Sequence, residues 1–420
     1  MQNHQDHVKK ALIIGSGIAG PALALFLKRA GIEAEIYETR ETPEGYALSL
    51  SCNGVAVLAE LGLDHAAFEE GSAVTKWQMQ NGKGKHLGGG VLASGDFKSI
   101  FIKRVPLGKI LSDEAERQGI KIVRGKRLEN IAETPQSGVS AIFQDGTSAS
   151  GDILIGGDGV HSRTRQFVDP AFPNATYTGL INSGGYTSAV KVPSQPETIN
   201  FIFCKHAFFG YHVSPTGYIY WFTNWPQVQE PVKGAFDGIT EAQRRQLMLE
   251  IYKHDQPFIR EIIQKAETTF PYFSSYALPK QPASWHKGRV VLLGDAAHAI
   301  SPSSGQGASM ALEDAAVLAK CLRDIPDVEQ AFTSFEHLRR ERTSKMYEVG
   351  VRGDAGKHVI NPMKQWFRDL TTPIFLKLFA NPKASDWMYS YRIDWNAKVE
   401  GAAAETGSRH ETVSAAGAEK

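Results

Sequence analysis

Short apolar runs that lead into glycine recur along the chain and predict buried strands followed by turns. Three such runs occupy residues 11–14, 153–155 and 290–293. Uninterrupted runs of this length are typical of strands buried on both faces of a sheet. After the first run, apolar residues over 23–27 predict a helix and residues 32–37 predict a further strand. This strand, helix, strand order predicts an α/β fold.

Three glycines follow the first run with the spacing G-x-G-x-x-G. Gly15 permits a tight turn, Gly17 lets the backbone approach a pyrophosphate, and Gly20 lets the helix pack closely on the strand. The helix begins inside this motif, so its free N–H groups face the phosphates. Glu38 ends the next strand, where its carboxylate can accept hydrogen bonds from both hydroxyls of an adenosine ribose. The predicted dinucleotide contacts of this unit are Gly15, Ser16, Gly17, Ile18, Ala19, Gly20, Glu38 and Thr39.

The first motif leaves two questions open. A glycine-rich turn of some other α/β protein is the alternative to a nucleotide site, and the motif by itself does not separate NAD from FAD. No second motif with the same strand and helix context occurs, since the glycine-rich residues 82–96 read as a hairpin or loop.

Composition narrows the class of protein. The chain has 420 residues and a net charge of +1, which predicts two or three domains and gives no bulk field for nucleic acid or an acidic membrane. Its three cysteines are far apart, which predicts a reduced, cytoplasmic setting without disulfides or a metal site. No uncharged stretch reaches roughly 18 residues, so we expect no stable membrane anchor.

Two later motifs repeat the strand-then-turn design. Asp158-Gly159 follows the second apolar run, and Gly294-Asp295 follows the third. In this order, with the first glycine motif, they make residues 10–350 resemble the class A flavoprotein monooxygenases, the para-hydroxybenzoate hydroxylase-like family. The resemblance implies an α/β fold with a Rossmann-like FAD-binding domain, an inserted, mostly antiparallel β-sheet substrate domain, and C-terminal helices.

The resemblance also implies contacts to FAD. Asp295 would contact the ribityl chain or ribose, and Asp158 would touch the pyrophosphate region and the path of the nicotinamide nucleotide. A helix starting near Gly307 would point its positive end at the pyrimidine side of the flavin ring. The other implied contacts are Ser49, Arg104, Leu128, Gly159, Gly294, Pro302, Gly305, Gln306, Ala308 and Ser309.

Structural alternatives accompany several of these residues. Asp295 is also a plausible helix cap in an ordinary turn, and Asp158 is a plausible cap for a helix starting near Ser162. Arg163 and Arg165 fit phosphate contacts and a solvated helix face equally well. His298 is expected to support the flavin loop rather than act as a base, and family members usually have small residues where this chain has Tyr46.

Residues 176–274 are rich in aromatic and β-branched residues, which predicts a sheet. Alternation over residues 218–225 places Tyr218, Tyr220 and Phe222 on one face and Ile219, Trp221 and Trp225 on the other. The sequence does not indicate which face of the sheet is directed toward the flavin. The candidate catalytic and pocket residues are Tyr220 and His212, followed by Phe209, Tyr211 and Tyr186, with sheet packing as the alternative for each.

The expected domains follow from these patterns. Residues 10–75, 100–175 and 275–350 would form the FAD-binding domain, and residues 76–99 and 176–274 the substrate domain. Residues 351–400 would form a C-terminal helical segment that packs on the body, and residues 401–420 a disordered tail. Membrane contact by residues 374–379 is the less favoured reading of that helical segment.

The resemblance implies an FAD-dependent monooxygenase that uses NAD(P)H and O2 and acts through a flavin C4a-hydroperoxide. Because the predicted strands carry no basic cluster, a neutral or weakly acidic aromatic or polyketide-like substrate fits, and His212 or His206 could help deprotonate a phenol. The alternatives are an FAD-dependent reductase or cyclase, a flavin halogenase, and a flavin-binding sensor; tetracycline-type antibiotic inactivation is an alternative substrate reading. NADH against NADPH, and monomer against homodimer, stay open.

Overall fold

A six-stranded sheet brings the three apolar runs together. The computed structural model describes residues 8–134, 138–358, 361–379 and 382–399. The sheet order is β20-β21-β13-β1-β2-β9, and all pairs are parallel except β20 with β21. The α/β prediction is confirmed. The strands are β20 (His286–Lys287), β21 (Val290–Leu292), β13 (Ile153–Gly156), β1 (Lys10–Ile14), β2 (Glu33–Tyr37) and β9 (Lys121–Val123).

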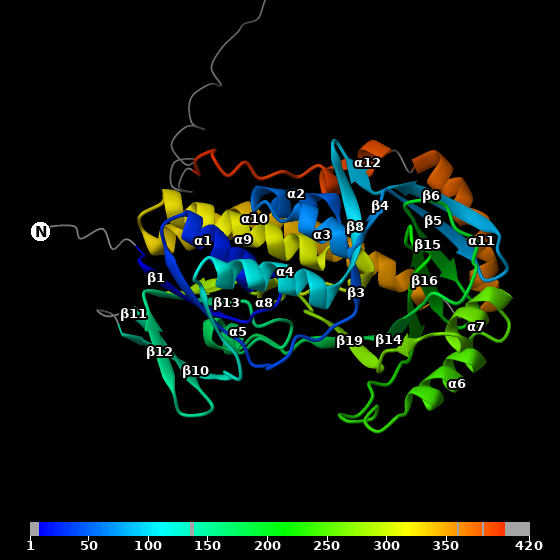
Figure 1. The fold of residues 1–420 in the computed structure, drawn as a ribbon, viewed down its shortest axis with the longest axis horizontal. Helices are drawn as coiled ribbons and strands as arrows, with labels where there is room; N and C mark the ends of the chain where they lie inside the picture. Colours follow the sequence, from blue (N-terminus) through cyan, green and yellow to red (C-terminus); the bar gives the residue numbers. More distant parts are fainter. Residues whose placement is uncertain (1–7, 135–137, 359–360, 380–381, 400–420) are drawn as a thin grey trace, which may run out of the picture.

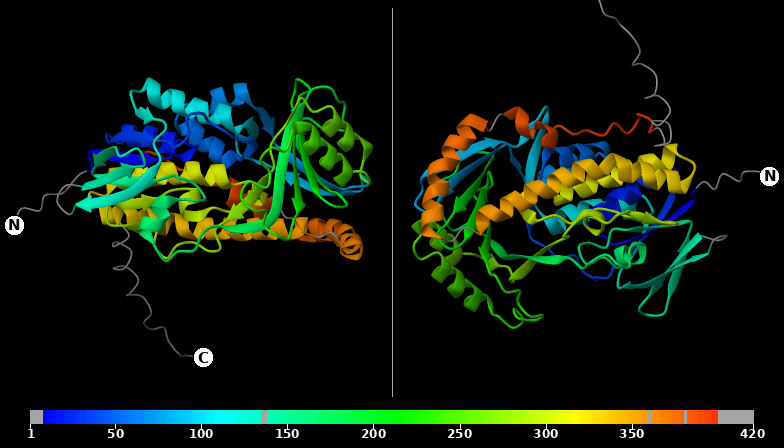
Figure 2. Two further views of the ribbon diagram at one scale, coloured as in Figure 1. Left: turned by 90° about the horizontal axis from the view of Figure 1, so that it is seen from below. Right: turned by 180° about the vertical axis from the view of Figure 1, so that it is seen from behind.

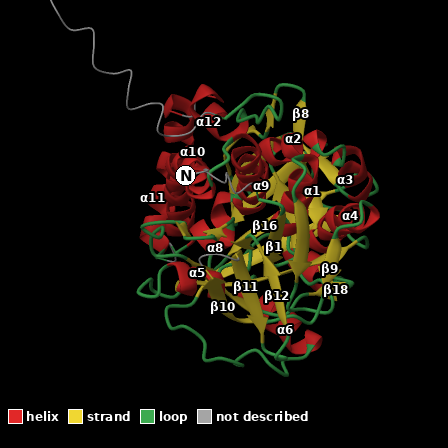
Figure 3. Ribbon diagram, turned by 90° about the vertical axis from the view of Figure 1, so that its left-hand side faces the viewer, coloured by secondary structure: helices red, strands yellow, loops and turns green. Residues whose placement is uncertain are grey.

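Different elements pack on the two faces of this sheet (Figures 1 and 3). One face carries helices, of which α1 packs against both α4 and α9. The other carries a small three-stranded sheet and α5. The helices are α1 (Ala19–Arg29), α4 (Arg104–Arg117), α9 (Gly307–Asp324), α10 (Val328–Lys357) and α5 (Arg163–Val168), and the small sheet is β10 (Leu128–Thr134), β11 (Gly138–Phe143) and β12 (Ser148–Gly151).

The predicted aromatic strands form an eight-stranded sheet with β6, from the earlier glycine-rich segment, and β5, which precedes it. The strand pairs in the described sheet are antiparallel except β5 with β15. Residues 82–96, expected to form a hairpin or loop, supply the turn and the second strand of the β5–β6 hairpin. The strands are β5 (Lys76–Asn81), β6 (His86–Val91), β14 (Thr176–Thr187), β15 (Thr198–Phe203), β16 (Phe208–Val213), β17 (Ile219–Pro226), β18 (Thr268–Thr269) and β19 (Phe273–Ala277).

A third set of elements connects these two parts. Strands β3, β4, β7 and β8 form a four-stranded sheet that lies against the aromatic sheet. The remaining elements are β3 (Ala47–Leu50), α2 (Cys52–Glu60), α3 (Asp64–Glu70), β4 (Ser72–Val74), β7 (Ala93–Ser94), β8 (Phe97–Lys103), α6 (Glu241–Ile251), α7 (Pro257–Gln264), α8 (Asp295–His298), the 3-10 turn η1 (Pro302–Ser304), α11 (Pro362–Phe379) and α12 (Pro382–Tyr389).

The C-terminal region returns to the body of the molecule. Helix α10 runs from the main sheet to the aromatic sheet (Figure 2), and α11 contacts β6. Trp395 is buried and stacks on Phe26, with ring centroids 5.2 Å apart. The tail expected to be disordered lies outside the described residues. Among the described helices, none has the length and apolar character to cross a membrane.

Candidate active site

The three glycine motifs meet at one edge of the main sheet, because each follows a strand that runs in the same direction. Gly15 N donates to Tyr37 O at 2.8 Å, and Gly157 N donates to Ile14 O at 2.8 Å. Leu293 N donates to Gly156 O at 2.9 Å. Ligands of open α/β sheets bind at this carboxyl edge.

The glycines of the first motif have separate roles. Gly15 has φ +107°, and a Cβ there would lie 2.4 Å from Gly157 O. A Cβ on Gly20 would lie 2.0 Å from Gly15 O, so the helix could not approach the turn. A Cβ on Gly17 would meet nothing closer than Arg104 Nη2 at 4.0 Å. Gly15 and Gly20 are therefore required by the protein's own packing, and Gly17 leaves open space for a ligand.

Glu38 is held beside this motif at the end of β2. Its carboxylate accepts hydrogen bonds from Ser16 N at 2.7 Å and Arg40 N at 2.8 Å. Each carboxylate oxygen retains acceptor capacity for a ribose hydroxyl. Thr39 is half-buried next to it, and Leu128 is buried in the neighbouring core.

Arg104 reaches the same motif from the start of α4. Its stem packs on Gly45, where a Cβ would lie 2.6 Å from Arg104 Cδ. Its guanidinium is exposed and makes no hydrogen bond to the described residues. An unpaired cation beside a phosphate-binding loop fits an anionic ligand.

The second motif forms a helix cap. Asp158 accepts from Arg163 N at 2.8 Å and Thr164 N at 3.0 Å, at the start of α5. Capping α5 is the structural alternative that the sequence offered for Asp158. Contact between Asp158 and a cofactor stays a prediction. Gly159 has φ +80° and open space at its Cβ position. The reading of Arg165 as a phosphate contact or a solvated residue was wrong, because it is buried and donates to Ala296 O and Val160 O.

The third motif forms a loop with exposed backbone, which we call the cradle loop (residues 294–307). Gly294 has φ +58°, and the Asp295 carboxylate is exposed without a hydrogen-bond partner among the described residues. A Cβ on Gly307, the first residue of α9, would meet only Asp295 Oδ1 at 4.0 Å. Gly305 has φ +65° and open space, and Pro302 is exposed.

Buried side chains fix the base of the cradle loop. Gln306 donates to Ser51 Oγ at 3.0 Å and accepts from Asn53 Nδ2 at 3.1 Å. Ser309 Oγ accepts from Ser51 N at 3.1 Å. Ala308 is half-buried in the same first turn of α9. Ser49, on β3, is half-buried just before this contact region. The loop is thus open on one side and anchored on the other.

A buried ionic network below the cradle loop was not predicted. Asp314 accepts from Gly294 N at 3.1 Å, from His298 Nε2 at 2.5 Å and from Arg339 Nε at 2.7 Å. Glu313 contacts Arg339 at 2.7 Å and Arg342 at 2.8 Å. Burial alone would raise the pKa of Asp314, but the charges of His298 and Arg339 outweigh it and lower that pKa. Two adjacent carboxylates in an apolar helix are the sequence signal that could have revealed this network.

The aromatic sheet has two different faces. Ile219 and Trp221 pack with Phe209 and Tyr211 beneath α6 and α7, on what we call the outer face. The opposite, inner face carries Tyr220 and Phe222, which pack near Phe101 of β8. The predicted alternation is correct. Phe209 and Tyr211 were wrong as pocket candidates, since helices cover them on the outer face.

Tyr220 and its neighbours form an aromatic row on the inner face. Tyr220 pairs across the sheet with Tyr186 and with His212. It is half-buried, and its hydroxyl makes no hydrogen bond to the described residues. Lys103 Nζ lies 4.4 Å from the centre of the Tyr186 ring. A partly uncovered aromatic surface of this kind suits a planar ligand.

His212 is a satisfied, buried histidine in this row. Its Nδ1 lies 3.1 Å from Thr198 O, which can only accept, so Nδ1 carries the proton. Nε2 then accepts from Ser72 Oγ at 2.7 Å. Burial lowers the pKa of His212. Acting as a base would require breaking the Ser72 bond, and His206 lies in the exposed turn between β15 and β16.

Tyr46 connects the two parts of the candidate site. Its ring stacks on Phe273 at 4.6 Å and meets Phe270 edge-on at 4.5 Å, and its hydroxyl donates to Pro271 O at 2.8 Å. Burial raises the pKa of Tyr46 to about 12. The ring therefore closes the inner face at one edge as a neutral phenol.

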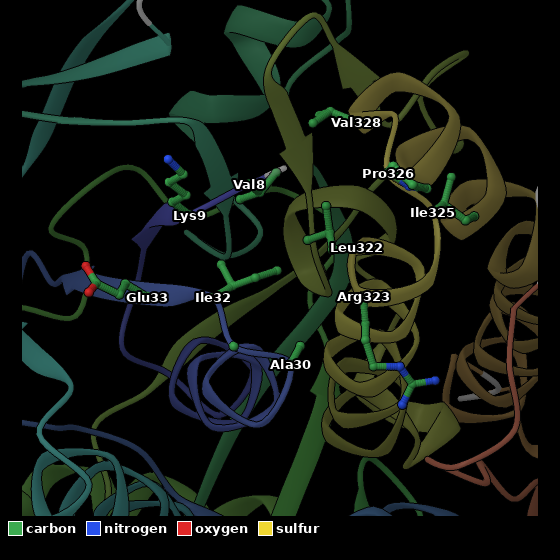
Figure 4. Close-up of a pocket in the computed structure, with 11 residues that line it drawn as sticks. Val8, Lys9, Ala30, Ile32, Glu33, Leu322, Arg323, Ile325, Pro326 and Val328 are labelled. Carbon is green, nitrogen blue, oxygen red and sulfur yellow. The ribbon is translucent and has the colours of Figure 1, made fainter. Parts of the chain in front are cut away.

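The cavity in Figure 4 lies elsewhere. It is lined by residues at the start of β1 and β2 and by the turn between α9 and α10, including Lys9, Glu33 and Arg323. This is the amino edge of the main sheet, opposite the glycine motifs. It contains none of the predicted site residues.

Comparison with known proteins places these features in context. Residues 9–348 match the family model described as FAD binding domain. The chain is 29% identical over 368 residues to the putative FAD-dependent monooxygenase YetM of Bacillus subtilis, covering 81% of this chain and 92% of the relative. It is 28% identical to an FAD-dependent urate hydroxylase of Mycolicibacterium vanbaalenii (86% and 92% covered) and 26% identical to 6-hydroxynicotinate 3-monooxygenase of Pseudomonas fluorescens (80% and 89% covered).

Solved structures share the fold. Klebsiella pneumoniae HpxO complexed with FAD and uric acid superposes with a TM-score of 0.79 at 24% identity, covering 92% of this chain and 97% of that chain. A salicylate hydroxylase substrate complex has a TM-score of 0.75 at 20% identity (93% and 97% covered). The tetracycline destructase Tet(55) has a TM-score of 0.66 at 21% identity (89% and 97% covered).

Proposed function

Because the chain belongs to the FAD-binding-domain family and is an FAD-dependent monooxygenase, we propose that it hydroxylates a small aromatic compound held between the cradle loop and the inner face of the aromatic sheet. NAD(P)H would be the reductant and O2 the oxidant. The observation that carries this proposal is the meeting of three glycine motifs at one sheet edge, with open backbone at Gly17, Gly305 and Gly307.

The residues present fit FAD. Gly17 and the start of α1 would receive the pyrophosphate, Arg104 would pair with it, and Glu38 would hold the adenosine ribose. The exposed carboxylate of Asp295 would accept hydrogen bonds from the ribityl hydroxyls. When bound, FAD supplies the redox chemistry that links NAD(P)H, O2 and the substrate.

The chain would contribute position, charge and exclusion of water. The N-terminus of α9, starting at Gly307, would stabilise negative charge on the nearby flavin ring. Gln306, bonded to Ser51 and Asn53, would keep that helix start in place. The aromatic row around Tyr220, closed by Tyr46, would exclude water from the reacting atoms.

Both the inner face and the relatives support a small aromatic substrate. Their names specify urate, 6-hydroxynicotinate and salicylate, all of which are small and planar. The inner face offers flat aromatic side chains on which a small planar compound can stack. Nothing in the described part of the structure favours a tetracycline-sized substrate or a reductase without oxygenation.

Substrate-stimulated NAD(P)H oxidation tests the proposal. The FAD-loaded protein would be given NADH or NADPH with urate, 6-hydroxynicotinate, salicylate and simple phenols, and hydrogen peroxide would be assayed in parallel. We expect at least one compound to accelerate nucleotide oxidation with little peroxide. FAD that neither nucleotide reduces, with or without these compounds, would contradict the proposal.

A further inference from the structure

A chain of hydrogen-bond donors ends at one edge of the inner face. Lys357 Nζ donates to Asn224 Oδ1 at 2.7 Å. Asn224 Nδ2 in turn donates to Asn182 Oδ1. Because an ammonium can only donate, it fixes the orientation of both amides along this chain. We call Lys357, Asn224 and Asn182 the donor cluster.

The donor cluster has unused donors. Asn182 is 5% exposed, and its Nδ2 has no hydrogen-bond partner among the described residues. The ammonium of Lys357 has three N–H groups and makes one hydrogen bond to the described residues, to Asn224. A buried amide donor without an acceptor is costly, and a ligand that brings an acceptor to Asn182 Nδ2 would relieve that cost.

The donor cluster lies directly beside the cradle loop. One turn before Lys357 on α10, Asp354 accepts from Ser301 Oγ at 2.6 Å and from Ser303 Oγ. A Cβ on Gly353 would lie 2.9 Å from Ser303 Cβ, so glycine permits this close approach. The last turn of α10 therefore contacts the cradle loop through Asp354 and the aromatic sheet through Lys357.

The other neighbours of the Lys357 ammonium are flat and apolar. Lys357 Nζ lies 4.5 Å from the centre of the Phe208 ring. Phe208 is paired with Asn224 across the sheet, and Phe222 occupies the next inner-face position of β17. A ligand ring lying along Phe222 toward Tyr220 would present a substituent to the donor cluster.

We propose that the donor cluster binds the carboxylate of an aromatic acid, so that the substrate of the proposed reaction is anionic. This inference rests on the proposed function and specifies its substrate class. It departs from the sequence-based expectation of a neutral or weakly acidic substrate. That expectation came from the strands alone, whereas Lys357 lies at the end of α10.

Paired acids and amides test the proposal on the FAD-loaded protein. Salicylate and salicylamide, and 6-hydroxynicotinate and 6-hydroxynicotinamide, differ mainly in charge. Their dissociation constants would be measured from the change that binding causes in the flavin absorbance. The variants are Lys357→Met, which removes the charge, and Lys357→Arg, which keeps it. Lys345→Met, an exposed position on the same helix, is the matched control.

We expect the wild type to bind at least one acid more tightly than its amide. Lys357→Met should weaken acid binding about tenfold or more and change amide binding less than about twofold, because a charge-assisted hydrogen bond is lost. Lys357→Arg should retain most of the preference for acids, and Lys345→Met should behave as wild type. FAD content and melting temperature, measured on every variant, should be unchanged.

Two results would overturn the inference. One is equal weakening of acid and amide in Lys357→Met, and the other is a wild type that binds none of the acids. In either case, phenol-stimulated NAD(P)H oxidation with little peroxide would leave the proposed function standing. If phenols also failed to stimulate NAD(P)H oxidation, both the inference and the proposed function would be contradicted.

Discussion

Arg339 and Asp314 form a fully buried ion pair directly below the cradle loop, with Arg339 Nε 2.7 Å from Asp314 Oδ1. The same carboxylate accepts from Gly294 N, the backbone that turns β21 into the loop. This pair therefore connects α10 to the residues that would hold the flavin ring. The carboxylates of α9 are paired with arginines of α10, which explains why a charged network occurs between these otherwise apolar helices.

Removal of Arg339 should affect both folding and cofactor binding. Arg339→Met leaves two buried carboxylates, Glu313 and Asp314, with fewer partners, and we expect a loss of about 3–5 kcal/mol in the free energy of unfolding. Urea unfolding of the apoprotein would measure this. Arg352→Met, an exposed position on the same helix, should change stability by less than about 0.5 kcal/mol. Equal stability of the two variants would contradict the structural role.

Gly17 should be the glycine whose substitution removes FAD without unfolding the protein. Gly17→Val places a side chain in open space, so the apoprotein should keep its melting temperature. Its FAD affinity should fall at least about tenfold, or about 1.4 kcal/mol. Gly15→Val should instead destabilise the fold, because of its φ of +107° and the contact with Gly157 O. A Gly17→Val protein with full FAD content would disprove the assigned pyrophosphate position.

Asp295→Ala should lower FAD occupancy with little effect on the apoprotein. The carboxylate is exposed and has no partner in the described structure, so its loss removes no internal contact. Equilibrium titration with FAD would compare it with Asp96→Ala, which removes an exposed carboxylate from the turn between β7 and β8. Unchanged affinity in both variants would exclude Asp295 from the cofactor site.

Affinity for aromatic acids should fall at alkaline pH. Burial lowers the pKa of Lys357 to about 8, and the carboxylate of Asp354 partly offsets that effect. His358 follows Lys357 on the same helix, and Arg368 of α11 lies over the Phe203 ring, which packs on Phe208. Phe208, Asn224 and Asn182 are uncharged. Since the protonated amine binds the anion, the dissociation constant should rise as pH increases through about 8. In Lys357→Arg it should stay flat, because arginine remains charged.

The sequence predicted the features that depend on local spacing. The glycine motifs encode turns at the ends of buried strands, and the structure brings these turns together at one sheet edge. The roles of Asp295 and the cradle loop came from the family resemblance. Alternation in β17 separated Tyr220 from Trp221. The turns and the alternation both follow from residues close together in the chain.

Features that depend on distant contacts were not predicted. Nothing near Tyr220 indicates that α6 and α7 cover the opposite face, so Phe209 and Tyr211 were placed wrongly. Lys357 and Asn224 are 133 residues apart, and only the path of α10 past the cradle loop brings them together. The domain boundaries and the cofactor contacts stay predictions.

Incorporation of oxygen from O2 into product tests the central claim most directly. The FAD-loaded protein would turn over its best aromatic substrate with NAD(P)H under dioxygen labelled with the heavy oxygen isotope, and the product would be analysed by mass spectrometry. The account predicts one labelled oxygen atom in each hydroxylated product molecule. A product that carries no label, or nucleotide oxidation that yields only hydrogen peroxide with every substrate, would contradict it.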